Sequence, residues 1–329
     1  MLEHGGRLQQ AAKKYGIPLS DWSDLSTGIN PAVYPIPAID PACWNRLPED
    51  DDGLEAAAAA YYGNDRLLVL PGSQAAIQSL PALFPTAAVA CIAPLYEEHP
   101  HAWQRSGHLL RRLPNLSRVL AATTPNVLLC NPNNPTAATH ARADLLAAAA
   151  QLHKRGGWLI VDEAFADPEP ENSVVTLAGS AEAPNLIVLR SLGKFFGLAG
   201  ARVGFIFGAA EKLERLREML GPWAVSNPSR AVARQALLDN TWQAAARVEL
   251  VAASQRLAEV LAPLGAVSRT ALFCTVATPQ VEALHGHLAA RALLTRRFDQ
   301  HGLLRFGLPA NEGEWLRLQQ AVAAWSAPC

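Results

Sequence analysis

Short and almost continuous apolar runs alternate with helical patterns along the first two thirds of the chain. The runs are rich in Val, Ile, Leu and Ala and occupy residues 87–94, 126–132, 157–165, 185–191 and 201–208. This pattern is typical of strands covered on both faces of a mostly parallel sheet, because neither face meets water. Between two of the runs, residues 140–155 have the length and composition of a crossover helix. The sequence therefore predicts an α/β domain on a mostly parallel central sheet.

The pattern changes after residue 228. Longer helical stretches appear, notably over 241–265, interleaved with candidate strands at 272–278 and 303–309. We expect a large α/β domain over residues 31–228 and a smaller α+β domain over 229–329. Residues 1–30 are expected to form an N-terminal arm that packs with the small domain.

Composition and charge narrow the classes of function. Half of the 329 residues are hydrophobic, which is enough for a substantial core, and the formal net charge is −1. Basic and acidic residues are spread along the whole chain, so no basic stripe indicates nucleic acid or an anionic membrane as a partner. We expect a small-molecule partner instead.

The cysteines and the N-terminus bear on the compartment. The five cysteines are widely separated, without CxxC or CxxH spacing, so they indicate reduced thiols rather than disulfides or a metal site. The N-terminus lacks the apolar core of a secretory signal, and no run approaches the roughly 18 apolar residues that cross a bilayer. We therefore expect a cytoplasmic protein that holds no metal.

Chemically distinctive residues follow the predicted strands. NPNNPT (131–136) comes directly after one apolar run, Asp162 lies near the end of another, and Ser191 and Lys194 follow a third. The turn PGSQAA (71–76) precedes a helical pattern, so its amides could receive an anion. Because ligands bind outside the carboxyl ends of parallel strands, these residues are expected to share one site.

A lysine, a carboxylate, an arginine and anion-binding amides together suit pyridoxal phosphate. This cofactor needs a Schiff-base lysine, an acid that pairs with its pyridine nitrogen and donors for its phosphate. Lys194 and Asp162 fit the first two roles. The expected phosphate donors are Ser73, the Gln74 amide, Ser191 and Arg202, through charge-assisted hydrogen bonds.

The motifs NPNNPT, VDEAF (161–165) and SLGKFFGLAGARVGF (191–205), in this order, resemble the fold-type-I pyridoxal-phosphate enzymes related to histidinol-phosphate aminotransferase. HGG (4–6) and DLSTGINP (24–31) narrow the resemblance to the branch that decarboxylates L-threonine O-3-phosphate in cobalamin biosynthesis. The resemblance runs from His4 to the segment around Arg305. It implies a homodimer with active sites near the interface.

The resemblance also implies roles for single residues. Lys194 would bind the cofactor covalently, Asp162 would pair with the pyridine nitrogen, Asn134 would donate to the ring oxygen, and Tyr96 would stack on the ring. Arg305 would bind the substrate carboxylate through its planar fork. The remaining substrate positions, near the substrate phosphate, are His4, Asn30 and Arg296, the last chosen over the adjacent Arg297.

Two residues depart from the family pattern. Phe165 stands where the aminotransferases usually have a tyrosine that supports the ring oxygen, which weakens an aminotransferase interpretation. Leu47 stands where relatives commonly offer a tyrosine to the cofactor phosphate of the neighbouring subunit, and leucine has no hydroxyl for that contact. A histidinol-phosphate-type aminotransferase and a non-catalytic pyridoxal-phosphate-binding regulator remain as alternatives.

Overall fold

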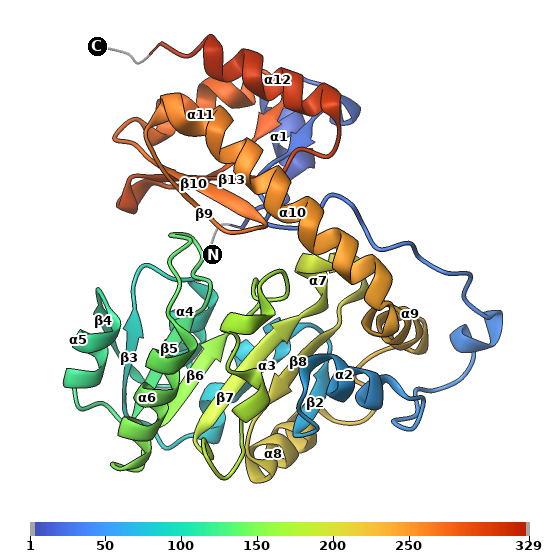
Figure 1. The fold of residues 1–329 in the computed structure, drawn as a ribbon, viewed down its shortest axis with the longest axis vertical. Helices are drawn as coiled ribbons and strands as arrows, with labels where there is room; N and C mark the ends of the chain where they lie inside the picture. The colour runs from blue at the N-terminus through green and yellow to red at the C-terminus, as the bar shows by residue number, and fades with distance from the viewer. Residues whose placement is uncertain (1–3, 327–329) are drawn as a thin grey trace. The chain divides into compact units, whose positions relative to one another are not determined.

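A computed structural model describes residues 4–326, which divide into two compact units (Figure 1). The larger unit comprises residues 33–134 and 139–244. The smaller unit comprises the described residues up to Ala32, the segment Pro135–Ala138 and those from Ala245 onward.

The larger unit is built on a seven-stranded sheet in the order β2-β8-β7-β6-β5-β3-β4. Neighbouring strands from β4 to β7 run parallel, whereas β8 runs antiparallel to both β7 and β2. The predicted α/β class with a mostly parallel sheet is therefore confirmed. The strands are β2 (Leu67–Leu70), β3 (Ala88–Ile92), β4 (Leu109–Leu113), β5 (Asn126–Cys130), β6 (Trp158–Asp162), β7 (Leu186–Ser191) and β8 (Gly204–Phe207).

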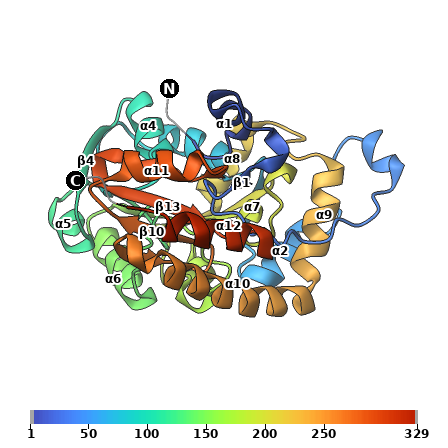
Figure 2. The same cartoon turned by 90° about the horizontal axis from the view of Figure 1, so that it is seen from above.

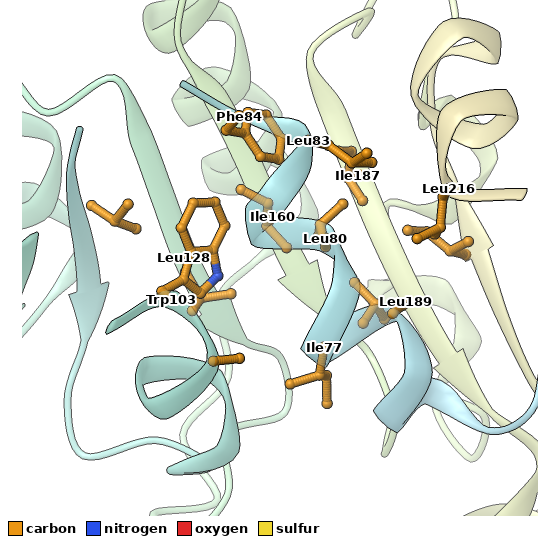
Figure 3. Close-up of a cluster of buried hydrophobic side chains, with 14 of the residues drawn as sticks. Ile77, Leu80, Leu83, Phe84, Trp103, Leu128, Ile160, Ile187, Leu189 and Leu216 are labelled. Carbon is orange, nitrogen blue, oxygen red and sulfur yellow. The ribbon is translucent and has the colours of Figure 1, made fainter. Parts of the chain in front are cut away.

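Helices pack on this sheet and bury its apolar residues. The crossover predicted over 140–155 is α6 (Arg142–His153), which joins the parallel strands β5 and β6. Figure 3 shows Ile160 and Leu189 of the sheet among Ile77, Leu80 and Trp103. Burial of each such side chain contributes about 1.5–3 kcal/mol. The other helices are α2 (Leu54–Tyr62), α3 (Ser73–Ser79), α4 (Glu98–Arg105), α5 (Leu116–Ala121), α7 (Leu192–Phe195), α8 (Ala210–Leu220) and α9 (Asn227–Leu238).

The smaller unit has an antiparallel sheet in the order β12-β13-β10-β9, and its helices α11 and α12 are seen in Figure 2. The two strands expected at 272–278 and 303–309 are β10 (Phe273–Ala277) and β13 (Leu303–Gly307). A two-stranded parallel sheet joins β1 to β11, so the N-terminal segment belongs to this unit. The remaining elements are α1 (Leu8–Tyr15), β1 (Ser23–Asp24), β9 (Ala266–Arg269), α11 (Val281–Ala289), β11 (Leu293–Leu294), β12 (Arg296–Phe298) and α12 (Glu312–Ala323).

The division between the units falls later than the expected boundary at residue 228. It lies at 244/245, inside the long helix α10 (Asn240–Leu261). The reason is that α9 packs on α2 and carries Arg230, whose guanidinium lies 2.7 Å from carboxylate oxygens of both Asp52 and Glu55. These contacts tie residues 227–238 to the larger unit.

Two further findings concern the helices and the cysteines. In residues 4–326, no helix is long and apolar enough to cross a membrane. The four described cysteines, Cys43, Cys91, Cys130 and Cys274, are free thiols, and Cys329 lies outside the described residues.

Candidate functional site

The predicted cofactor-binding residues gather at one edge of the large sheet. Strands β3, β5, β6 and β7 are parallel, and their carboxyl ends lead to Tyr96, Asn134, Asp162 and Ser191 respectively. The two antiparallel pairings of β8 make β2 parallel to β7, so Ser73 and Gln74, which follow β2, lie at the same edge. Arg202 lies there as well, because it precedes the start of β8, and Lys194 lies on α7 directly after β7.

Asp162 is held by a buried histidine. Oδ2 of Asp162 lies 2.7 Å from Nε2 of His99, and the two residues are 5% and 2% exposed. Oδ1 of Asp162 accepts a hydrogen bond of 3.0 Å from the backbone amide of Ala164. A ring nitrogen and a carboxylate oxygen at this distance share one hydrogen bond, whose direction depends on the tautomer of His99. The pair fixes the orientation of a buried carboxylate at the end of β6.

The start of α3 and Arg202 form a cradle for an anion. A Cβ atom added to Gly72 would lie 2.6 Å from Nη2 of Arg202, so the guanidinium rests against this glycine. A Cβ atom on Gly204 would lie 2.5 Å from the amide nitrogen of Ser73, so the start of β8 packs closely on the start of α3. Arg202 itself has a φ of 54°, a left-handed conformation that few non-glycine residues adopt. The backbone thus brings a guanidinium and the first amides of α3 together.

The side chain of Gln74 does not bind Arg202 of the cradle but the carboxylate of Glu98. Its Nε2 donates to Oε2 of Glu98 over 2.7 Å, and Nε2 of Gln78 donates to the same oxygen over 2.9 Å. Glu98 lies on α4, the helix that also carries His99. The backbone amide of Gln74, which is the predicted phosphate donor, does not depend on this side-chain contact. Glu98 therefore links the elements that carry the cradle and the His99–Asp162 pair.

Lys194 lies beside an aromatic ring. Its Nζ is 5.3 Å from the centroid of Phe165, a residue that is 8% exposed. Asn134 is buried, and Tyr96 packs edge-on against the imidazole of His99, with 6.2 Å between the ring centroids. The lysine, the aromatic rings and the buried acid thus belong to the same unit.

The predicted substrate residues belong to the smaller unit. Arg305 is 7% exposed, and its Nη2 donates to the carbonyl of Ser26 over 2.8 Å. Arg296 lies directly opposite Arg305 in the β12–β13 pairing, which puts the two side chains on one face of the sheet. Asn30 is buried, and its Oδ1 accepts from the amide of Ala32 over 2.9 Å, whereas His4 is exposed.

The side chain of Arg297 faces the opposite side of that sheet, and its guanidinium is paired with two carboxylates. Its Nε and Nη2 donate to Asp299 over 2.9 and 2.6 Å, and its Nη1 lies 3.4 Å from Glu282. A side chain with two carboxylate partners is poorly suited to a substrate anion.

One group of potential metal ligands falls within the same site. Ligand atoms of His99, Cys130 and Asp162 lie within 4.8 Å of one another. The 2.7 Å separation in the His99–Asp162 pair is a hydrogen-bond length, shorter than the roughly 3.3 Å between neighbouring ligands of a tetrahedral zinc ion. Burial, reinforced by the nearby Asp162 carboxylate, raises the pKa of the Cys130 thiol well above its ordinary value, which keeps it protonated. We therefore assign no metal to this group.

Sequence reasoning missed three charged or titratable residues of this region: His99, Glu98 and Arg190. His99 follows Tyr96 by three residues, the spacing that brings two side chains to one face of a helical turn. That spacing was the available signal for His99. Arg190 had none, because it sits inside an apolar run and its partners Glu163 and Asp167 are distant in sequence.

Comparisons with known proteins place the chain in a family. Residues 45–321 match the family described as aminotransferase class I and II. The chain is 51% identical to a threonine-phosphate decarboxylase of Pseudomonas aeruginosa over 100% of this chain and 99% of the relative. It is 40% identical to a threonine-phosphate decarboxylase of a Sinorhizobium species over 97% of each chain.

The fold has a solved counterpart. The structure of histidinol-phosphate aminotransferase from Sinorhizobium meliloti in complex with pyridoxal-5'-phosphate superposes with a TM-score of 0.83. It covers 98% of this chain and 99% of its own, at 18% identity, so it bears on the fold alone. The resemblance found in the sequence motifs is confirmed, and the chain belongs to the aminotransferase class I and II family.

Proposed function

We propose that this protein is a pyridoxal-phosphate-dependent carboxy-lyase that converts L-threonine O-3-phosphate to (R)-1-amino-2-propanol O-2-phosphate in cobalamin biosynthesis. The observation that carries the proposal is the 51% identity, over the whole chain, to a relative named threonine-phosphate decarboxylase. The site supports it, since a lysine, a buried acid and an anion cradle share one sheet edge.

The residues at this edge fit pyridoxal phosphate. The cradle, which contains Ser73, the Gln74 amide and Arg202, would hold the phosphate together with Ser191. Lys194 would bind the cofactor covalently. Asp162 would hold a proton on the pyridine nitrogen, with His99 keeping its carboxylate in place. Asn134 and Tyr96 would contact the ring oxygen and the ring face. When bound, the cofactor supplies an electron sink for the bond at the substrate Cα that breaks.

The smaller unit suits a substrate with two anionic groups. Arg296 and Arg305 are directly opposed on neighbouring strands, where like charges repel each other. Anions bound between or beside them would relieve that repulsion. L-threonine O-3-phosphate has a carboxylate for the fork of Arg305 and a phosphate for Arg296, with His4 and Asn30 as further phosphate contacts.

Substrate orientation would select the reaction. If Arg305 binds the carboxylate while Arg296, His4 and Asn30 bind the phosphate, rotation about the Cα bonds is restricted and one bond is favoured for cleavage. Unphosphorylated threonine would leave the phosphate-binding groups without their ligand, so it should react poorly. Once the substrate amine has taken its place on the cofactor, Lys194 would have a free amine that could return a proton to Cα after CO2 leaves.

A homodimer in the cytoplasm is part of the proposal. The segment 33–47 of the larger unit exposes large apolar side chains: Ile36 is 66% exposed, Trp44 74% and Leu47 61%. Three large apolar side chains exposed within this one segment favour an interaction surface there. A second copy of the chain would cover them, and Trp44→Glu should then raise the monomer fraction in sedimentation velocity. The free thiols of the described cysteines suit a reducing compartment.

A panel of substrates tests the proposal. The protein loaded with pyridoxal phosphate is incubated with L-threonine O-3-phosphate, L-serine O-phosphate, L-threonine or L-histidinol phosphate, each with and without 2-oxoglutarate as amino acceptor, and products are identified by mass. We expect loss of CO2 from threonine phosphate above all. Arg296→Gln should raise KM for threonine phosphate, whereas Arg297→Gln, the matched control, should not. Turnover of histidinol phosphate alone would favour an aminotransferase, and no turnover of any compound would favour a non-catalytic binding protein.

A further inference from the structure

A buried arginine holds both ends of the loop that follows β6. Nη1 of Arg190 lies 2.9 Å from Oε2 of Glu163, and Nη2 lies 3.1 Å from Oδ1 of Asp167. The side chains of all three residues are at most 2% exposed. The planar fork of arginine can bind two acceptors at a fixed spacing, which lysine cannot reproduce. We call Arg190, Glu163 and Asp167 the Arg190 clamp.

Other groups hold the clamp rigidly. Glu163 also accepts from the hydroxyl of Ser173 and, over 2.8 Å, from the amide of Val174. The hydroxyl of Tyr61 donates to Oδ1 of Asp167 over 3.1 Å. The guanidinium of Arg190 lies 4.8 Å from the ring centroid of Tyr62. Although burial alone would lower it, the carboxylates of Asp167 and Glu163 raise the pKa of Arg190, so the guanidinium stays charged.

In the sequence, Phe165 lies midway between Glu163 and Asp167, whose carboxylates Arg190 binds. The clamp fixes positions 163 and 167, and the ring of Phe165 lies 5.3 Å from Nζ of Lys194. Arg190 also precedes the Ser191–Lys194 segment, so one residue is joined to both the β6 loop and the strand that carries the lysine. Displacement of the loop would therefore change the surroundings of the lysine amine.

We propose that Arg190 is a positioning residue: through Glu163 and Asp167 it seats the Phe165 ring against Lys194, and this ring shields the amine and stabilises its ammonium form. The inference deepens the proposed function, in which Lys194 binds the cofactor. An aromatic face attracts an ammonium and covers it from water. Loss of the ring should therefore make the lysine both more exposed and more often neutral.

The reactivity of Lys194 in the cofactor-free full chain measures this shielding. Trace labelling with acetic anhydride at a fixed pH, followed by peptide mass analysis, gives the rate at Lys194. Lys212 serves as the internal reference, since its Nζ also lies near aromatic rings, 5.0 Å from that of Phe84. The measured quantity is the ratio of the two labelling rates.

Four variants decide the outcome. Phe165→Leu should raise the ratio about three- to tenfold, which is the effect of losing one cation–π contact. Arg190→Lys, which retains the charge but not the fork, should raise it similarly, and the double variant should not exceed Phe165→Leu. The matched control is Asn185→Ala, which removes two buried hydrogen bonds, to Ala149 and Gly157, at the other end of β7 and should leave the ratio unchanged.

An unchanged ratio in folded Arg190→Lys, or multiplied effects in the double variant, would overturn the inference. If circular dichroism shows that Arg190→Lys is unfolded, Asp167→Glu replaces it, because it retains the charge while displacing one arm of the clamp; an unchanged ratio there is equally decisive. Added pyridoxal phosphate should protect Lys194 from labelling in the unmodified protein. Failure of that protection alone would contradict the proposed function while leaving the clamp standing.

Discussion

The cradle between Gly72 and Arg202 can be tested by one methyl group. In Gly72→Ala the new Cβ would lie 2.6 Å from Nη2 and 3.1 Å from Cζ of Arg202, so the guanidinium must move. A lost hydrogen bond to a charged group costs about 1.5–3 kcal/mol of binding free energy. This corresponds to a roughly 10- to 150-fold larger dissociation constant for the cofactor. Titration of the cofactor-free protein with pyridoxal phosphate, followed by absorbance, measures that constant.

A second glycine separates this effect from backbone strain. Gly72 has a φ of 79° and a ψ of 154°, a conformation almost confined to glycine, and Gly156 has a φ of 71°, so alanine at either position costs about 1–3 kcal/mol of folding stability. A Cβ on Gly156, however, has nothing within 4 Å. Gly156→Ala should therefore lower the melting temperature but leave cofactor affinity unchanged. Equal affinities in the two variants would refute the assignment of Arg202 to the phosphate.

Three further substitutions extend the test. Lys194→Ala should abolish the yellow colour and the borohydride-reducible linkage to the cofactor, and a linkage that persists would move the role to another lysine. Asp162→Asn should keep the fold and lose about 10²- to 10⁴-fold in turnover, since an amide cannot hold the pyridinium proton by charge; near-normal turnover would exclude this role. Although burial would raise it, the hydrogen bond from Arg230 lowers the pKa of Asp52 below 3.8. Its stabilisation is therefore present above that pH and lost as the pH falls through the folded-state pKa. Denaturant unfolding should show that Asp52→Asn costs about 1–2 kcal/mol at pH 7, discounted for partial exposure, and that the difference shrinks below about pH 4.

The larger unit was predictable because its pattern is strong. Strands β3, β5, β6, β7 and β8 lie within the five apolar runs, since a strand covered on both faces needs apolar residues throughout. The edge strand β4 was not predicted, because it is half open to water and its sequence LLRRL shows no such run. The end of the larger unit was set too early, because the contact of α9 with α2 depends on ion pairs between distant residues.

The candidate site also contains residues that the sequence could indicate and residues that it could not. Asp162, Ser191 and Lys194 could be proposed because Asp162 and Ser191 end strands and Lys194 comes shortly after one, and parallel strand order brings these strand ends to one edge. His99 and the Arg190 clamp were not found, because each depends on pairing between residues that only the fold brings together. Apart from the spacing of Tyr96 and His99, these buried groups carry no periodic signal in the sequence. Their partners can be assigned only from three-dimensional contacts.

The central claim is that the chain removes CO2 from a phosphorylated amino acid without a second substrate. The most direct measurement is CO2 release from L-threonine O-3-phosphate by the purified protein loaded with pyridoxal phosphate, with and without 2-oxoglutarate. We predict equal CO2 release in both cases, with an amino-alcohol phosphate as the product. A strict requirement for 2-oxoglutarate, with glutamate formed in proportion and no CO2, would contradict the account and identify an aminotransferase.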